Sequence, residues 1–432
     1  MKSPATAADL HLATMLAGAA AVLLTGLVFG RLATRFRQPV VIGEIVAGIA
    51  LGPSLLGHLP GDLPHRLFPA EVRPLLNAVA QVGLMLFMFM VGWEFDKNLL
   101  RPHKGTATMV SLTSVGFAFA CGTAIASVLY RNHHETDGRP ISFTAFAMFM
   151  GTAMSVTAFP VLARILKDNR LSHTRVGVLA LASAAVDDLL AWCLLAYVSA
   201  LATADGNGRL LQVGLLSAVY VALMFLVVRP LLAGLVGRLV ARQQWRPLLL
   251  LLCAGVFLSS WLTTWIGIHA IFGAFLFGFV MPREPAHLLK ERLHPPLEHV
   301  STLLLPVYFV VIGLGVDIGG LGAYQYLELT LIVAVACAGK LLGALVPAKF
   351  FGLSWAESRT LGLLMNTRGL TELIILNAAA SLGVLDGQMF TMMVIMALLT
   401  TALAGPLLPV GPPVLEPEPL PSRRRDLTET RI

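Results

Sequence analysis

Hydrophobic residues occur along this chain in long runs separated by short polar stretches. Most runs approach the roughly 20 residues that a transmembrane helix needs. They lack the alternation of apolar and polar positions that is typical of a membrane β-barrel. The pattern therefore predicts an all-α polytopic membrane protein of about thirteen transmembrane helices. The predicted spans cover residues 8–30, 40–57, 74–93, 106–130, 141–163, 176–201, 210–232, 246–265, 268–281, 297–315, 325–350, 356–381 and 387–409.

The number of spans depends on whether residues 246–281 form one tilted helix or two helices separated near Gly267. With two helices, twenty-two Lys and Arg side chains gather on one side of the membrane and six on the other. One helix would place neighbouring basic clusters on opposite sides. Because cytoplasmic loops are enriched in Lys and Arg, we favour thirteen spans, with the N-terminus outside and the C-terminus in the cytoplasm.

Composition excludes a soluble enzyme, since 56% of the residues are hydrophobic and only 13% are charged. Soluble proteins carry about 25% charged residues. We expect a membrane transporter domain over residues 1–410 and a disordered, proline- and arginine-rich cytoplasmic tail over 411–432. The net charge of +7 is explained by cytoplasmic loops and not by nucleic acid binding. No enzymatic activity and no cofactor are expected.

A short motif occurs twice, as Ile45–Gly52 and as Ile271–Gly278. The copies lie in the second and ninth predicted spans, so an odd number of crossings separates them and they run in opposite directions. Inverted repeats of this kind, here about 40–201 and 268–409, are typical of secondary transporters. Packing of small residues between helices could produce the same pattern.

Asp187 and Asp188 lie near the middle of the sixth span. A charge at that depth costs about 2.5–3.5 kcal/mol on insertion scales and is usually functional. Adjacent residues on a helix point about 100° apart, so we expect the two carboxylates to have different partners. A site for a cation or a proton is the preferred interpretation, and a purely structural pair of buried acids is the alternative.

Lys340 is the lysine placed deepest within a span. Its small neighbours Ala338, Gly339 and Gly343 would let another helix approach closely. We predict that Lys340 forms an ion pair with a carboxylate of the sixth span. The alternative is that its side chain extends to the membrane interface.

The fifth span carries Thr152, Ser155 and Thr157 shortly before Pro160. Proline removes a backbone hydrogen bond and opens a membrane helix. The freed carbonyls and the three hydroxyls are suitable oxygen ligands for a monovalent cation, although such hydroxyls also serve in ordinary helix packing.

The twelfth span is interrupted by the polar stretch around Arg368 and Glu372, at the matching place of the second repeat. Two broken helices would bring opposite helix-dipole ends together in the membrane. Arg368 and Glu372 are spaced i, i+4 and could pair with each other or support the site directly. Glu44, one turn into the second span, could serve in packing or gating. His133 and His134 are expected in an extracellular loop without further metal ligands.

Five stretches resemble the monovalent cation:proton antiporter-2 family, which contains sodium/proton and potassium/proton exchangers. They are Phe36–Gly57, Ser155–Leu166, Ala184–Trp192, Ala338–Gly343 and Met365–Leu373, in the order found in the family. The resemblance implies six core helices, including the crossed broken ones, that move like an elevator against a dimerisation domain. It also implies that Asp188 binds the ion and that Lys340 pairs with Asp187.

The sequence therefore predicts an antiporter that exchanges Na⁺ or K⁺ for protons. We expect it in the plasma membrane, surrounded by the lipid bilayer and assembled as a homodimer. A potassium efflux channel-like system is one alternative, although the chain has no TVGYG-like filter. A membrane sensor that does not transport is another. The oxygen ligands available do not distinguish sodium from potassium.

Overall fold

The computed structural model describes residues 7–36, 38–94, 104–136, 138–171, 174–203, 207–284 and 286–408. The predicted cytoplasmic tail, 411–432, lies outside these ranges. Within them the fold is helical, apart from a short hairpin of β1 (Glu135–Thr136) and β2 (Arg139–Pro140). An all-α architecture is thereby confirmed.

Ten segments of the described chain are long and apolar enough to cross a membrane. They are formed by α1 (Ala7–Arg35), α2 (Val40–Leu51) with its following 3₁₀ turn (Leu56–His58), α4 (Arg73–Glu94), α5 (Lys104–Leu129), α8 (Arg175–Thr203), α9 (Asn207–Leu223) joined through a π-helical turn (Met224–Val228) to α10 (Arg229–Ala241), α11 (Trp245–Ile266), α13 (Ala286–Leu314), α14 (Ala323–Phe350) and α17 (Gly387–Leu407). A five-residue helix, α3 (Leu63–Leu67), lies between α2 and α4.

Shorter helices complete the count of about thirteen spans. One span is divided into α6 (Phe143–Ser155) and α7 (Phe159–Asp168), and another into α15 (Trp355–Met365) and α16 (Leu370–Ser381). The remaining one is α12 (Ala270–Val280). The predicted separation of the eighth and ninth spans is present. The helix α11 ends at Ile266 and is followed by Gly267, whose φ of 104° is in the left-handed region that favours glycine.

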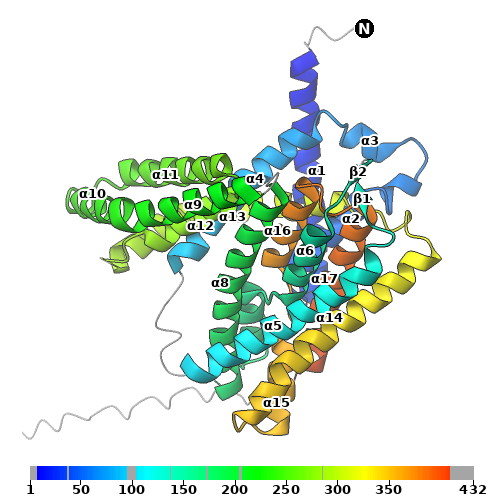
Figure 1. Cartoon of the computed structure of the whole chain (residues 1–432). Helices are drawn as coiled ribbons and strands as arrows, with labels where there is room; N and C mark the ends of the chain where they lie inside the picture. Colours follow the sequence, from blue (N-terminus) through cyan, green and yellow to red (C-terminus); the bar gives the residue numbers. More distant parts are fainter. Residues whose placement is uncertain are drawn as a thin grey trace, which may run out of the picture.

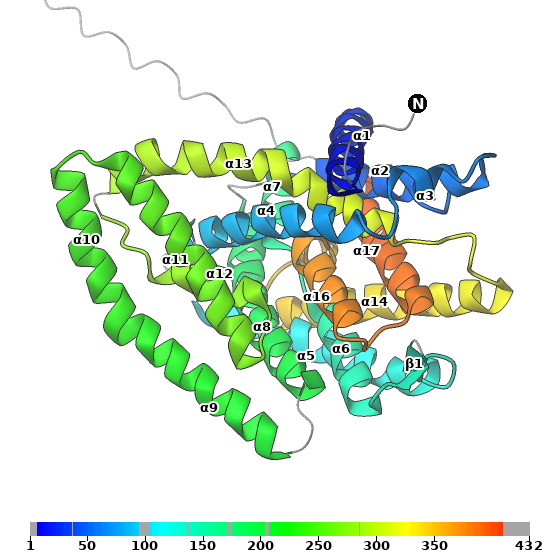
Figure 2. The ribbon, with the colours of Figure 1, turned by 90° about the horizontal axis from the view of Figure 1, so that it is seen from above.

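The helices form two groups (Figures 1 and 2). In the first, which we call the core bundle, α5 packs against α14, α6 and α8, and α15–α17 pack around them. In the second, the outer bundle, α4 packs against α12 and α13, α2 packs against α1 and α13, and α9–α11 lie at the far end. Both broken spans belong to the core bundle.

The repeated motif marks equivalent helix contacts in the outer bundle. In α2, a Cβ added at Gly48 would lie 2.2 Å from the carbonyl oxygen of Val310 in α13. In α12, a Cβ at Gly278 would lie 2.0 Å from the carbonyl oxygen of Phe89 in α4. A glycine of the motif thus allows α2 to pack closely against α13, and the matching glycine allows α12 to pack closely against α4.

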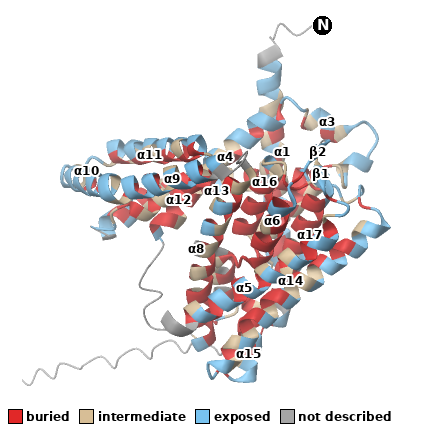
Figure 3. Cartoon of the chain, in the orientation of Figure 1, coloured by how far each residue is buried: buried red, intermediate tan, exposed pale blue. Residues whose placement is uncertain are grey.

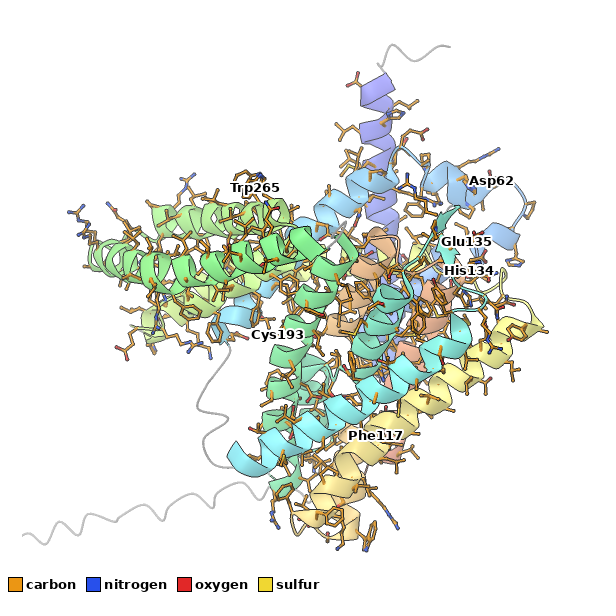
Figure 4. All side chains as sticks on the ribbon, in the orientation of Figure 1. Asp62, Phe117, His134, Glu135, Cys193 and Trp265 are labelled. Carbon is orange, nitrogen blue, oxygen red and sulfur yellow. The ribbon has the colours of Figure 1, made fainter. Side chains whose placement is uncertain are left out.

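Buried residues concentrate in the core bundle, whereas α9, α10 and α11 are largely exposed (Figure 3). Much of the exposed surface is apolar, including Leu226 on the π-helical turn and Trp265 on α11. Trp265 and Phe117 both point away from the protein (Figure 4). Apolar side chains directed outward are suited to contact with lipid, as expected of a multi-pass membrane protein.

Candidate functional site

The two broken spans meet inside the core bundle. The helix α6 ends at Ser155 and α7 begins at Phe159, while α15 ends at Met365 and α16 begins at Leu370. Between the breaks, the N–H of Ala158 donates to the carbonyl of Thr367 over 3.1 Å. Non-helical backbone is tolerated at membrane depth only where protein or water forms hydrogen bonds with its N–H and carbonyl groups. Here the first break supplies the N–H and the second supplies the carbonyl.

Asp187 of α8 lies beside this crossing and is surrounded by donors. Lys340 of α14 donates to Asp187 Oδ2 over 2.8 Å, and the hydroxyl of Thr157 lies at the same distance from that oxygen. Ser111 of α5 donates to Oδ1 over 2.5 Å. All four side chains are completely buried. The carboxylate is therefore held in place by partners on α5, on α14 and in the break between α6 and α7.

The close approach of α5 to α14 makes this ion pair possible. A Cβ added at Gly343 would lie 3.0 Å from the Cα of Ser114, so the small residue brings α5 next to Lys340. Lys340 also donates to the hydroxyl of Ser114 over 3.3 Å. The predicted pairing of Lys340 with a carboxylate of the sixth span is present. We did not predict Ser111 and Ser114, although their i, i+3 spacing places both hydroxyls on one face of the fourth span.

Asp188 points in a different direction from Asp187, as the 100° step predicts. Its Oδ1 accepts a hydrogen bond of 3.2 Å from Thr371 of α16. The side chain also lines a cavity of about 460 Å³ between the bundles, with α7 and α8 on one side and α4, α12 and α13 on the other. Asp188 is thus the acid of the pair that lines the cavity.

Arg368 links the two breaks. Its guanidinium donates to the carbonyls of Ala153 and Met154 over 2.7 and 2.9 Å, at the C-terminal end of α6. It also pairs with Glu372 over 3.2 Å, as their i, i+4 spacing allows. A positive charge is favourable at a helix C-terminus and a negative charge near a helix N-terminus. Arg368 and Glu372 therefore stabilise α6 and α16 where these helices end at the crossing.

Comparison with known proteins identifies the family to which the chain belongs. The family described as sodium/hydrogen exchanger, transmembrane, matches residues 19–411. The chain belongs to this family of sodium/hydrogen exchangers. Its members are secondary transporters and not enzymes, so the chain is a membrane antiporter of the cation/proton class.

Individual relatives agree with this membership. The chain is 42% identical over 391 residues to a Na(+)/H(+) antiporter of Synechocystis, NhaS4, covering 89% of this chain and 94% of that one. It is 39% identical to the cation/H(+) antiporter 15 of Arabidopsis thaliana, covering 87% of this chain and 45% of the relative. The K(+)/H(+) antiporter 1 of Saccharomyces cerevisiae is 33% identical, with 86% of this chain and 42% of the relative covered. The chain thus spans less than half of these plant and yeast relatives.

The fold is also similar to that of a solved antiporter structure. MjNhaP1, the sodium proton antiporter of Methanocaldococcus jannaschii, superposes with a TM-score of 0.65 at 15% identity. The match covers 92% of this chain and 96% of MjNhaP1. At this level of identity the similarity supports the fold of the exchanger and not its substrate.

Two of the three hydroxyls predicted as cation ligands, those of Thr152 and Ser155, donate to backbone carbonyls of α6. Thr152 donates to the carbonyl of Met148 over 2.8 Å, and Ser155 donates to that of Thr152 over 2.9 Å. Threonine and serine in membrane helices commonly bond to the preceding turn in this way. Thr157 bonds to Asp187 and Met365, so the hydroxyl donor observed at Asp188 is that of Thr371, which we did not predict.

Glu44 lies apart from this network. It is buried in α2, 8% exposed, and its Cγ lies 3.9 Å from the position of a Cβ at Gly26 in α1. Among the described residues, neither Asp187 nor Asp188 bonds to it. Glu44 thus packs against α1 within the outer bundle, and a role in gating stays a prediction.

His133 lies in a loop after α5, as the sequence predicts, and it has two acidic neighbours that the sequence did not reveal. Its side chain is only 1% exposed and lies between Asp386, 2.5 Å away, and Glu328, 3.1 Å away. Burial by itself lowers the pKa of His133, but the hydrogen bonds and charges of Asp386 and Glu328 outweigh it and leave the pKa above its ordinary value. The histidine joins the end of α5 to α14 and α17, helices that are distant in the sequence.

Proposed function

We propose that this antiporter exchanges a monovalent cation, Na⁺ or K⁺, for protons at Asp188. The observation that carries this proposal is the position of Asp188, a buried carboxylate of the core bundle on the wall of a cavity between the two bundles. Asp187 is already occupied by Lys340, Ser111 and Thr157. Asp188 is therefore the group of the pair that is free to exchange its partner.

Coupling follows from competition at one carboxylate. Asp188 binds either a proton or the cation, so loading one requires release of the other. Thr371 completes part of the cation shell through its hydroxyl oxygen, and carbonyls freed at the two breaks supply further oxygen ligands. Arg368 and Glu372 support the crossing without contacting the ion, and Thr157 with Lys340 keeps Asp187 in place.

Alternating access arises from movement of the core bundle against the outer bundle, like an elevator. The site residues lie on core helices, whereas the opposite wall of the cavity is formed by α4, α12 and α13. Moving one bundle past the other would close this cavity and expose Asp188 on the opposite side. This motion would act on two inverted repeats, about 40–201 and 268–409, in a domain that covers residues 1–410.

The proposed setting is the plasma membrane, with the N-terminus outside, the C-terminal tail 411–432 in the cytoplasm, and two copies forming a homodimer. Twenty-two basic residues on the cytoplasmic side support this orientation. In that orientation the cavity opens toward the cytoplasm, because Glu94 at its mouth directly precedes a basic loop. Sodium is the first cation to test, since the relative from Synechocystis is named a Na(+)/H(+) antiporter.

The decisive experiment measures proton movement in proteoliposomes with a pH-sensitive dye while sodium, potassium and lithium are added in turn. We expect the wild-type protein to respond to at least one cation and Asp188→Asn to lose the response entirely. The amide keeps the shape of the side chain but can neither carry a proton nor offer a full negative charge. Asp62→Asn is the matched control, because Asp62 is an exposed aspartate on a distant loop (Figure 4).

A normal response of purified Asp188→Asn would remove Asp188 from the mechanism. Cation flux without any proton movement would favour the channel-like alternative. A wild-type protein that moves neither ion would favour the membrane sensor.

A further inference from the structure

A second cavity, of about 390 Å³, lies between α8 of the core bundle and α9 and α12 of the outer bundle. We call it the lateral cavity. Its mouth is formed by exposed residues, among them Cys193 and Tyr197 on α8 and Gly214 and Val221 on α9. Figure 4 shows Cys193 on the outer side of α8. The cavity therefore opens on the side of the molecule and not into the crossing of the broken helices.

The wall between the two cavities is aromatic. Trp192 and Phe275 line both the lateral cavity and the cavity that contains Asp188. The ring of Trp192 meets Phe275 at 5.9 Å and Phe272 edge-on at 6.0 Å between centroids. Trp192 lies on the same helix as Asp188, one turn further on, so this wall separates the ion path from the membrane.

Most polar side chains that line the lateral cavity already form hydrogen bonds within the protein. Ser217 donates to the carbonyl of Val213 over 2.7 Å, and Tyr220 bonds to the hydroxyl of Ser259 over 2.6 Å. Among the described residues, the indole N–H of Trp192 has no partner. A buried water needs two to four polar partners, and one donor does not supply them. Water is therefore a poor occupant of this cavity.

An empty cavity is also unfavourable, because its lining loses dispersion contacts on one side. The mouth continues into the apolar outer face of α9, where Leu211 and Leu215 are 75% and 64% exposed. In a membrane, the medium that contacts such a face is hydrocarbon. Hydrocarbon can enter from the bilayer without crossing a polar layer.

We propose that the lateral cavity is a binding site for the acyl chain of a membrane lipid, packed against Trp192 between the two bundles. The site is independent of the cation bound at Asp188. It would place a lipid chain at the boundary across which the bundles move, and it would close the ion path on the membrane side. Its volume lies in the range of about 300–1,000 Å³ found for sites that bury most of a small apolar ligand.

Quenching of tryptophan fluorescence by phosphatidylcholine with brominated acyl chains tests this site. In a variant that retains only Trp192, with the other five tryptophans changed to Phe, we expect strong quenching although the side chain is 4% exposed. A variant that retains only Trp93, which is 8% exposed and lies outside the cavity, should remain almost unquenched. The variant with only Trp265, 67% exposed, gives the level expected for full lipid contact.

Filling the lateral cavity with a larger side chain should prevent the quenching of Trp192 by brominated lipid. A Cβ at Gly214 meets no atom within 4 Å, so Gly214→Leu adds a side chain at the mouth without a backbone clash. In the Trp192-only protein this change should reduce quenching to the level of Trp93. Gly237→Leu on α10 is the matched control, since a Cβ there is equally unobstructed but does not line the cavity.

Quenching of Trp192 no greater than that of Trp93 would overturn the proposal. Efficient cross-linking of two copies through Cys193 would also overturn it, because a second copy would then cover the mouth. If the multiple substitution prevents folding, Trp192→Phe in the otherwise unchanged chain replaces it. That variant should lose part of the total quenching by brominated lipid, and unchanged quenching would count against the site. None of these readouts depends on transport, so the lipid site and the antiport activity can fail separately.

Discussion

At the scale of single residues, neighbouring side chains have different roles because a helix turns by about 100° per residue. Asp187 faces α5 and α14, where Ser111 and Lys340 donate hydrogen bonds to its carboxylate. Asp188 faces the cavity between the bundles. Removing one partner of a buried ion pair typically costs about 3–5 kcal/mol, because the other charge is left uncompensated. Removing either Asp187 or Lys340 alone should therefore destabilise the core bundle as well as the site.

The raised pKa of His133 predicts how stability varies with pH. The histidine is better stabilised as a cation in the folded protein, so its contribution is fully present below its ordinary pKa of about 6.5. The contribution decreases as the pH rises through the higher pKa of the folded state. His133→Gln should therefore lower the melting temperature of the purified protein most at mildly acidic pH, and progressively less toward alkaline pH.

The expected loss at acidic pH corresponds to a charged hydrogen bond, about 1.5–3 kcal/mol. Thermal unfolding of wild type and variant across this pH range checks it. Changing the exposed neighbour His134 to Gln serves as the control and should leave the melting temperature nearly unchanged (Figure 4). If the difference in melting temperature between wild type and His133→Gln instead grew with pH, His133 would be neutral in the folded protein.

At the scale of helices, the site depends on close packing between α5 and α14. Gly343 allows these helices to approach until Lys340 reaches Asp187 on α8. The two breaks depend on each other in the same way, since Thr157 of one bonds to Met365 of the other. Each element is positioned by its neighbour, so local sequence changes should have effects across helices.

Gly343→Leu should disrupt this packing. A Cβ at this position would lie 3.0 Å from the backbone of Ser114, which cannot move aside as a flexible side chain could. Overpacking of this kind costs about 1–3 kcal/mol. We expect a lower melting temperature together with reduced antiport in proteoliposomes. Gly234→Leu on α10, where a Cβ meets nothing within 4 Å, should change neither property. Equal behaviour of the two variants would contradict a role for this helix contact.

At the scale of the whole molecule, the cavity at Asp188 lies on the boundary between two bundles that are each well packed. One wall belongs to the core bundle and the other to the outer bundle. Such a boundary is suited to relative movement, because each bundle keeps its own buried interior. Added bulk in the cavity should then obstruct the movement without disturbing either bundle.

This expectation can be tested with Ala163→Cys on α7, which lines the cavity, in a chain whose four native cysteines have been replaced. A membrane-impermeant maleimide should react with it and inhibit transport in inverted vesicles but not in right-side-out vesicles. Leu303→Cys is the control, since this residue is 57% exposed on α13 but does not line the cavity. Labelling from the outside alone would reverse the proposed orientation. Labelling without inhibition would argue against closure of the cavity during transport.

The sequence by itself determined the membrane architecture of this protein. Long apolar runs, the glycine at residue 267 and the basic loops predicted about thirteen spans, because hydrocarbon admits few other backbone structures. Charged residues at mid-membrane depth are costly, so Asp187, Asp188 and Lys340 stood out without any structure. The interrupted fifth and twelfth spans were recognisable for the same reason.

Only the tertiary structure decided which polar groups meet. Thr371 reaches Asp188 from 183 residues away, and Ser111 reaches Asp187 from 76 residues away. A hydroxyl in a helix has its own carbonyls as competing partners, so the local sequence could not show that Thr152 and Ser155 bond within their own span. His133 lies 253 residues from Asp386, and no periodicity links them. Helix hydrophobicity sets where each span lies in the membrane, whereas rotation and packing of the spans determine the contacts inside it.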